Sequence, residues 1–121
     1  MKNIEPRVTR QRLVIEARYS AIINKETVKK YLLGLAKELE MTIHPDLKEP
    51  IITSATGKSI PIHDGWEGAI FWVESGASIY VWEKLNFLTV DIYTCKRFDN
   101  QKAIDFTAKF FKTTELEWSE L

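Results

Sequence analysis

The chain has 121 residues, 45% hydrophobic and 28% charged, which is enough for one domain whose core needs no disulfide or metal. Its formal net charge is zero, which argues against a nucleic-acid-binding protein, because such proteins carry a basic excess. There is no apolar run of 18 residues, no signal-peptide pattern, and only one cysteine. These features predict a single cytoplasmic domain over residues 1–121 without a membrane span.

The first part of the chain predicts a tail, a strand and a helix. Residues 1–10 form the tail, and residues 12–19 alternate and are rich in strand-forming side chains. Asn24 is a suitable N-cap for a helix over residues 25–40. That helix carries one apolar stripe, made of Val28, Leu32, Leu35 and Leu39.

Residues 45–66 are polar and rich in turn-forming residues, with room for a short strand at residues 51–54. Within them, ATGKS at residues 55–59 is similar to a phosphate-binding loop. Ile52 stands where that loop needs a glycine, and a proline follows in place of a helix. We therefore predict a polar surface loop there.

Three strands are predicted next, and a tight turn separates the first two. They cover residues 69–75, 78–84 and 87–95, with breaks at Gly76 and near Asn86. This pattern places Ser75 at the turn, between Glu74 and Gly76.

The last part of the chain predicts a second helix and a second tail. Asp99 caps a helix over residues 100–112. Its inward side chains are expected to be Ala103, Ile104, Ala108 and Phe111. Residues 113–121 are acidic and show no clear element, so we expect a tail.

These elements predict an α+β fold, a two-layer sandwich with a mostly antiparallel sheet and two helices on one face. Large apolar side chains point to both faces of the predicted hairpin, as with Phe71 against Trp72 and Tyr80 against Ile79. Two helices cover only one face, and an open apolar face of this size marks an interface. We expect a homodimer, or a complex with a related chain, through the other face.

Individual residues point to few sites. His44 and His63 have no metal-ligand spacing with each other or with the single cysteine, so no metal site is predicted. Cys95 ends a predicted strand, and a lone cysteine is more often a small buried hydrophobe than a nucleophile.

Taken together, several segments resemble the short, prokaryotic type of S-adenosylmethionine decarboxylase, a pyruvoyl enzyme of polyamine (spermidine) synthesis. These segments are RLVIEARY (12–19), GWEGAIFWVES (65–75), GASIY (76–80) and LNFLTVDIYTC (85–95). The resemblance covers most of the chain, from about Arg12 to Phe111. It implies the α+β sandwich and a cytoplasmic enzyme that cleaves its own chain.

The resemblance also implies roles for three residues. The Ser75 hydroxyl would attack the carbonyl of Glu74 and turn an amide into an ester. A base would then remove the α-proton of Ser75, the ester would be eliminated, and the chain would break. Ser75 would become a pyruvoyl group, which acts as an electron sink for the loss of carbon dioxide. Cys95 would return a proton to the product.

The chain departs from the family at the residues that assist cleavage. Gly76 replaces a histidine after the serine, and Tyr80 replaces the histidine that acts as the base. A phenol is a poor base near neutrality, whereas an imidazole is well matched. Glu67 replaces a serine that assists processing, and Glu83-Lys84 replaces a Pro-Glu pair.

Three hypotheses follow. The first is a non-self-processing homologue without a cofactor, which acts as a binding or regulatory partner and keeps a possible S-adenosylmethionine-like ligand. The second is an active self-cleaving enzyme, using pyruvoyl from Ser75 on S-adenosylmethionine or a basic amino acid, with His63 or Glu67 as substitute groups. In the third, Ser75 and Cys95 are relics in a protein with a new, non-enzymatic role.

Overall fold

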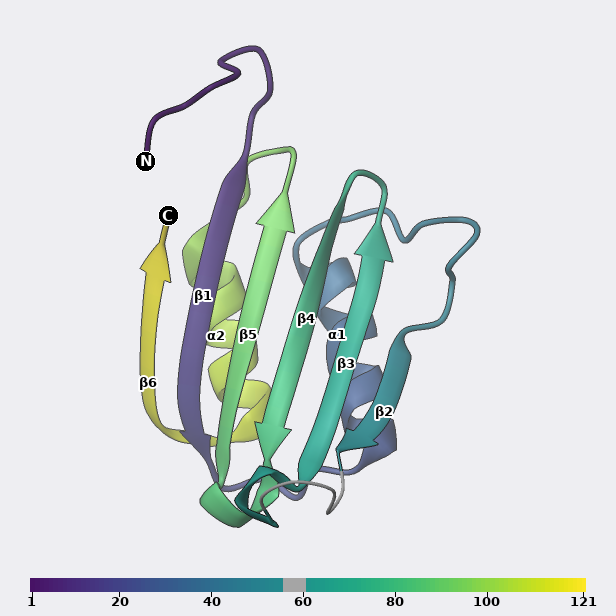
Figure 1. Cartoon of the computed structure of the whole chain (residues 1–121), viewed down its shortest axis with the longest axis vertical. Helices are drawn as coiled ribbons and strands as arrows, with labels where there is room; N and C mark the ends of the chain where they lie inside the picture. The colour runs from purple at the N-terminus through teal and green to yellow at the C-terminus, as the bar shows by residue number, and fades with distance from the viewer. Residues whose placement is uncertain (56–60) are drawn as a thin grey trace.

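The computed structural model describes residues 1–55 and 61–121 and shows a sheet of six strands with two helices (Figure 1). The strands are β1 (Gln11–Tyr19), β2 (Ile51–Ala55), β3 (Gly65–Trp72), β4 (Ser75–Trp82), β5 (Phe87–Thr94) and β6 (Thr113–Glu120). The helices are α1 (Lys25–Glu38) and α2 (Asn100–Phe111), with short 3-10 turns at Pro61–His63 and Glu83–Leu85. The predicted α+β sandwich is confirmed.

The strand order in the sheet is β2-β3-β4-β5-β1-β6, and every neighbouring pair is antiparallel. Strands β3, β4 and β5 follow one another through short connections, whereas β1 lies between the two strands that come late in the chain. Both helices cover the same face of the sheet (Figure 1). The opposite face, here called the open face, has no covering element within the described residues.

The helices begin where the sequence predicts. The Asn24 side chain accepts a hydrogen bond from the Thr27 N–H at 2.9 Å, and the Thr27 side chain accepts one from the Asn24 N–H, which completes a capping box. The Asp99 side chain caps α2 by accepting a hydrogen bond from the Gln101 N–H at 2.9 Å. Helix α1 ends at Glu38, slightly before the predicted end.

The core lies between the helices and the sheet. All four residues of the predicted α1 stripe are buried, and they face alternate residues of the strands such as Ile70 and Ile79. Gly68 allows this close packing, because a Cβ there would lie 2.8 Å from Cγ1 of Val28. In α2, Thr107 is fully buried, whereas Ala108, predicted to point inward, is only half-buried.

The acidic segment predicted as a C-terminal tail is strand β6, so that prediction is wrong. It pairs with β1 along nearly its whole length, for example Ala17 with Leu116. Leu116 packs against the core, while most other side chains of β6 are exposed. An edge strand pairs on one side only, so its composition stays polar and hides its strand character.

The hairpin between β3 and β4 also differs from its prediction. Its turn consists of Val73 and Glu74, and Ser75 already pairs with Trp72 as the first residue of β4. Glu74 has a φ of 59°, and this left-handed residue reverses the chain within two positions. Strand β3 also starts earlier than predicted, at Gly65, where a Cβ would lie 1.7 Å from the Val81 carbonyl oxygen.

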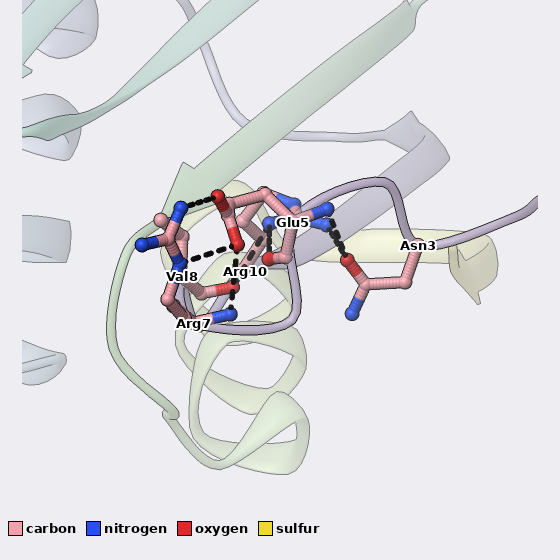
Figure 2. Close-up of polar contacts among 5 residues, drawn as sticks. All are labelled: Asn3, Glu5, Arg7, Val8 and Arg10. Atoms are coloured by element: carbon pink, nitrogen blue, oxygen red, sulfur yellow. Dashed lines mark hydrogen bonds and ion pairs between the residues drawn. The ribbon is translucent and has the colours of Figure 1, made fainter.

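Residues 1–10 form neither helix nor strand and are held by their own polar contacts (Figure 2). The Arg10 guanidinium donates to the carbonyl oxygens of Glu5 and Val8, at 2.8 and 2.9 Å, and to the Asn3 side chain. Arg7 pairs with the Glu5 carboxylate. The segment therefore forms a hook that precedes β1 and lies beyond the end of the sheet.

The predicted phosphate-loop-like stretch, at residues 55–59, lies almost wholly outside the described residues, which omit residues 56–60. Among the described helices, none is long and apolar enough to cross a membrane.

Candidate active site

The predicted nucleophile and proton donor lie in contact at one end of the sheet. Ser75 begins β4 and Cys95 directly follows β5, so the pairing of these strands brings them together. The Cys95 N–H donates to the Ser75 Oγ at 3.0 Å, and the Ser75 hydroxyl lies 3.5 Å from the Cys95 Sγ. Both residues are partly buried.

Glu74 completes this group. Its carboxylate accepts a contact from the Cys95 thiol at 3.7 Å, so three residues predicted from the resemblance converge. The left-handed backbone of Glu74 lies on the residue whose carbonyl would be attacked. A non-glycine residue in this conformation costs about 1–2 kcal/mol. The bond between Glu74 and Ser75 is therefore flanked by a strained residue, a hydroxyl and a thiol.

The other two predicted site residues lie elsewhere. Glu67 and Tyr80 pair with each other across β3 and β4, five residues along β4 from Ser75, or about 17 Å at the usual rise of a strand. Tyr80 is 41% exposed on the open face, and the Glu67 carboxylate lies 3.5 Å from the Thr53 hydroxyl. Within this chain, neither residue reaches the Glu74-Ser75 bond.

The histidines are also distant from Ser75. His63 lies with its ring edge-on to Trp82, with ring centroids 6.5 Å apart, at the far end of β4. The His44 N–H donates to the carbonyl oxygen of Phe71, and its Nδ1 accepts from the Asp46 N–H. Phe71 pairs with Gly76, so His44 is two strand spacings, about 10 Å, from the β4 backbone. His63 therefore does not replace the missing base within one chain.

Gly76 fills a position that side chains do not fit. A Cβ there would lie 2.8 Å from the carbonyl oxygen of Ile70, which is backbone and has little room to move. The histidine that the resemblance predicts after the serine would require a shift of the hairpin. The departure at Gly76 is thus built into the backbone.

A groove on the open face runs up to the Ser75 turn. Its volume is about 600 Å³, and its lining is mostly apolar. Its more prominent side chains are Arg12, Phe71, Ser78, Asp91 and Tyr93. The Arg12 guanidinium lies over the Tyr93 ring, 5.0 Å from its centroid. Sequence reasoning missed this groove, because it depends on which strand lies beside β5.

No group of three or more acidic, histidine or cysteine side chains that would suit a metal ion occurs in the described ranges, residues 1–55 and 61–121.

Comparisons with known proteins identify the family. The family model for S-adenosylmethionine decarboxylase matches residues 14–121. The S-adenosylmethionine decarboxylase proenzyme of Sulfolobus acidocaldarius is 31% identical over 90 residues, 74% of this chain and 74% of that protein. The proenzyme of Pyrococcus furiosus is 33% identical over 58 residues, 47% of this chain and 42% of that protein.

A solved structure shares the fold. The crystal structure of the adenosylmethionine decarboxylase from Aquifex aeolicus superposes with a TM-score of 0.73 at 18% identity, and the match covers 94% of this chain and 89% of that one. The family model covers nearly the whole chain, and the Sulfolobus relative is similar over three quarters of it. The chain therefore belongs to the S-adenosylmethionine decarboxylase family.

Proposed function

We propose that this chain is a non-self-processing member of its family, linked to polyamine biosynthesis, which acts as a binding or regulatory partner of a related decarboxylase subunit. One observation carries the proposal. Within the described residues of the chain, no imidazole contacts Ser75, and the position that would hold the base is Tyr80, on the far part of β4. In this proposal, Ser75 lacks the group that would complete its reaction.

The chemistry explains why the missing base matters. Attack of the Ser75 hydroxyl on the Glu74 carbonyl is reversible, because the ester that forms can return to the amide. Only removal of the Ser75 α-proton drives elimination, with cleavage of the ester bond and release of the Glu74 carboxylate. A phenol is a poor base near neutral pH and does not accept that proton efficiently. The expected outcome is an intact chain.

The open face supports the partner role. It presents large apolar side chains, including Phe71, which is 47% exposed, and Tyr93, which is 38% exposed. A second sheet of the same kind, from another copy or from a related decarboxylase subunit, would cover these side chains. Because Phe71 and Tyr93 also line the groove, the second sheet would enclose it as a mostly apolar site, which would offer the Asp91 carboxylate and the Arg12 guanidinium to an S-adenosylmethionine-like ligand.

An active self-cleaving enzyme is the second candidate, and the contact geometry favours it. Ser75, Cys95 and Glu74 retain the arrangement that the reaction needs. If a partner supplied the base, Ser75 would become the pyruvoyl group, which supplies an electron sink for decarboxylation. The Cys95 thiol, 3.5 Å from the Ser75 Oγ, fits this group as a proton donor.

The mass of the purified chain under denaturing conditions distinguishes the two candidates. We expect one species near 14.1 kDa for the wild type and for Ser75→Ala. Two fragments that meet between Glu74 and Ser75 in the wild type, and not in Ser75→Ala, would overturn the proposal. Tyr80→His combined with Glu67→Ser restores the base and should produce some cleavage if a second copy of the chain brings these positions to the Glu74-Ser75 bond, since within one chain they do not reach it.

A second experiment tests the partner role. The chain is mixed with a family member that retains the processing histidine and is followed by size-exclusion chromatography and by a decarboxylation assay. We expect the two proteins to elute together and the decarboxylation rate to change. Separate elution with an unchanged rate would exclude a regulatory role toward that subunit.

A further inference from the structure

The first residue of β1 is a buried glutamine whose side chain makes three hydrogen bonds. Gln11 is only 1% exposed. Its Nε2 donates to the Phe98 carbonyl oxygen at 3.0 Å and to the Asn100 Oδ1 at 2.7 Å, and its Oε1 accepts from the Phe98 N–H at 3.0 Å. Both donors of the amide are therefore used, and a single side chain binds both backbone groups of Phe98.

The segment that Gln11 holds is the connection between β5 and α2, which begins with Cys95. Gln11 pairs with Thr94 across β1 and β5, so it adjoins the point where the chain leaves the sheet. The start of β1, the start of β4 and the end of β5 lie at the same end of the sheet (Figure 1). Along the chain, Cys95 thus follows the paired strand β5 and precedes Phe98, the residue that Gln11 binds.

Two further contacts restrain the same connection. The buried Thr94 hydroxyl donates to the Lys96 carbonyl oxygen at 2.7 Å, and the Lys96 ammonium donates to the Glu40 carbonyl oxygen at 2.9 Å. These bonds act before and directly after Cys95. Gln11 restrains the following part at Phe98, where it binds both backbone groups, and beside it the Arg97 guanidinium lies 3.3 Å from the Glu120 carboxylate. Loss of the Gln11 bonds would free the Phe98 backbone.

A buried amide needs a reason, because burying it without partners costs about 1–3 kcal/mol, whereas an apolar side chain costs nothing of this kind. Position 11 belongs to the buried side of β1, where the alternating pattern predicts an apolar residue, as at Leu13 and Ile15. The groups that use the amide all lie in the connection after Cys95 or at the start of α2. The hydrogen bonds of Gln11 therefore serve that connection.

We infer that Gln11 is a positioning residue, which holds the Cys95 thiol against Ser75 and Glu74 by clamping the connection between β5 and α2. The inference rests on the proposed role of this chain only in so far as the Ser75-Cys95 contact matters for it. The geometric claim concerns the thiol and its two neighbours, and it is testable whether or not the chain is cleaved.

The rate at which iodoacetamide alkylates Cys95 measures the position of the thiol, because Cys95 is the only cysteine of the chain. Gln11→Met keeps the size of the side chain and removes its hydrogen bonds, and we expect alkylation to become faster by about fivefold or more. The matched control is Thr107→Val, which removes a buried hydrogen bond between the helices. It should change the rate by less than about twofold, since it leaves the connection intact.

A double-mutant cycle with Glu74→Gln separates positioning from loosening. In the wild type, removing the carboxylate 3.7 Å from the thiol should speed alkylation by about threefold, because the thiol loses a charged acceptor that restrains it. With Gln11→Met, the same change should have little effect. An equal effect of Glu74→Gln in both backgrounds would overturn the inference.

A second variant covers the case in which Gln11→Met does not fold. Gln11→Glu keeps an acceptor for the Phe98 N–H and loses both donors, and the same cycle with Glu74→Gln applies to it. We expect a coupling smaller than in the wild type, and an unchanged coupling would contradict the inference. Failure of the partner experiment above leaves this result unaffected, so the two claims fail separately.

Discussion

Glu74 combines an unfavourable backbone conformation with a contact to the Cys95 thiol. Its φ of 59° is one that glycine adopts freely and other residues do not. We predict that Glu74→Gly raises the free energy of unfolding by about 0.5–1 kcal/mol, the relief of strain less the entropy that glycine loses on folding. Urea denaturation measures the change. Glu74→Ala keeps the left-handed penalty and should give no gain, so an equal gain in both variants would contradict the strain.

The two helices are joined by a buried hydrogen bond between Tyr31 and Thr107, at 2.8 Å. Burial raises the pKa of Tyr31 well above its ordinary value, and the hydrogen bond to Thr107 lowers it by less. Above about pH 10 the unfolded chain loses this proton while the folded chain keeps it. The free energy of unfolding should therefore fall by about 1.4 kcal/mol per pH unit in that range.

Tyr31→Phe tests this link between α1 and α2. At neutral pH the variant should lose about 1 kcal/mol of stability with its hydrogen bond. Above pH 10 its stability should fall less steeply than that of the wild type, because no proton is held at position 31. Chemical denaturation from pH 7 to 11 compares the two, and parallel curves would show that Tyr31 does not cause the alkaline loss.

At the scale of the whole molecule, the open face is the surface that the proposal assigns to a second sheet. Phe71→Asp places a charge on this face, where it would be buried against a partner without a counterion. We predict a smaller species by analytical ultracentrifugation with an unchanged circular dichroism spectrum. Ile22→Asp is the matched control, since Ile22 is 89% exposed and lies in the connection between β1 and α1. The same sedimentation coefficient for the wild type and both variants would argue against an interface on this face.

The sequence was sufficient to predict most helices and strands, and also the Ser75-Cys95 pair of the candidate site. The alternation around Ile79, the cap at Asn24 and the Ser75-Cys95 pair could be predicted, because each depends on nearby residues or on a familiar motif. The acidic strand β6 could not, since an edge strand with a solvated face has a polar composition. The Gln11 clamp could not either. It joins residues 87 positions apart, and alternation shows which face a side chain takes but not its neighbours.

The position of β1 has a consequence for how the protein is made. Its neighbours in the sheet, β5 and β6, leave the ribosome after β2, β3 and β4. The roughly 70 residues between β1 and β5 take about 4–15 s to synthesise, and through that time both edges of β1 are bare. The sheet cannot close until β6 has emerged. Among the described strands, β1 therefore waits longest for its neighbours, and chaperones that bind unpaired apolar strands would meet it first.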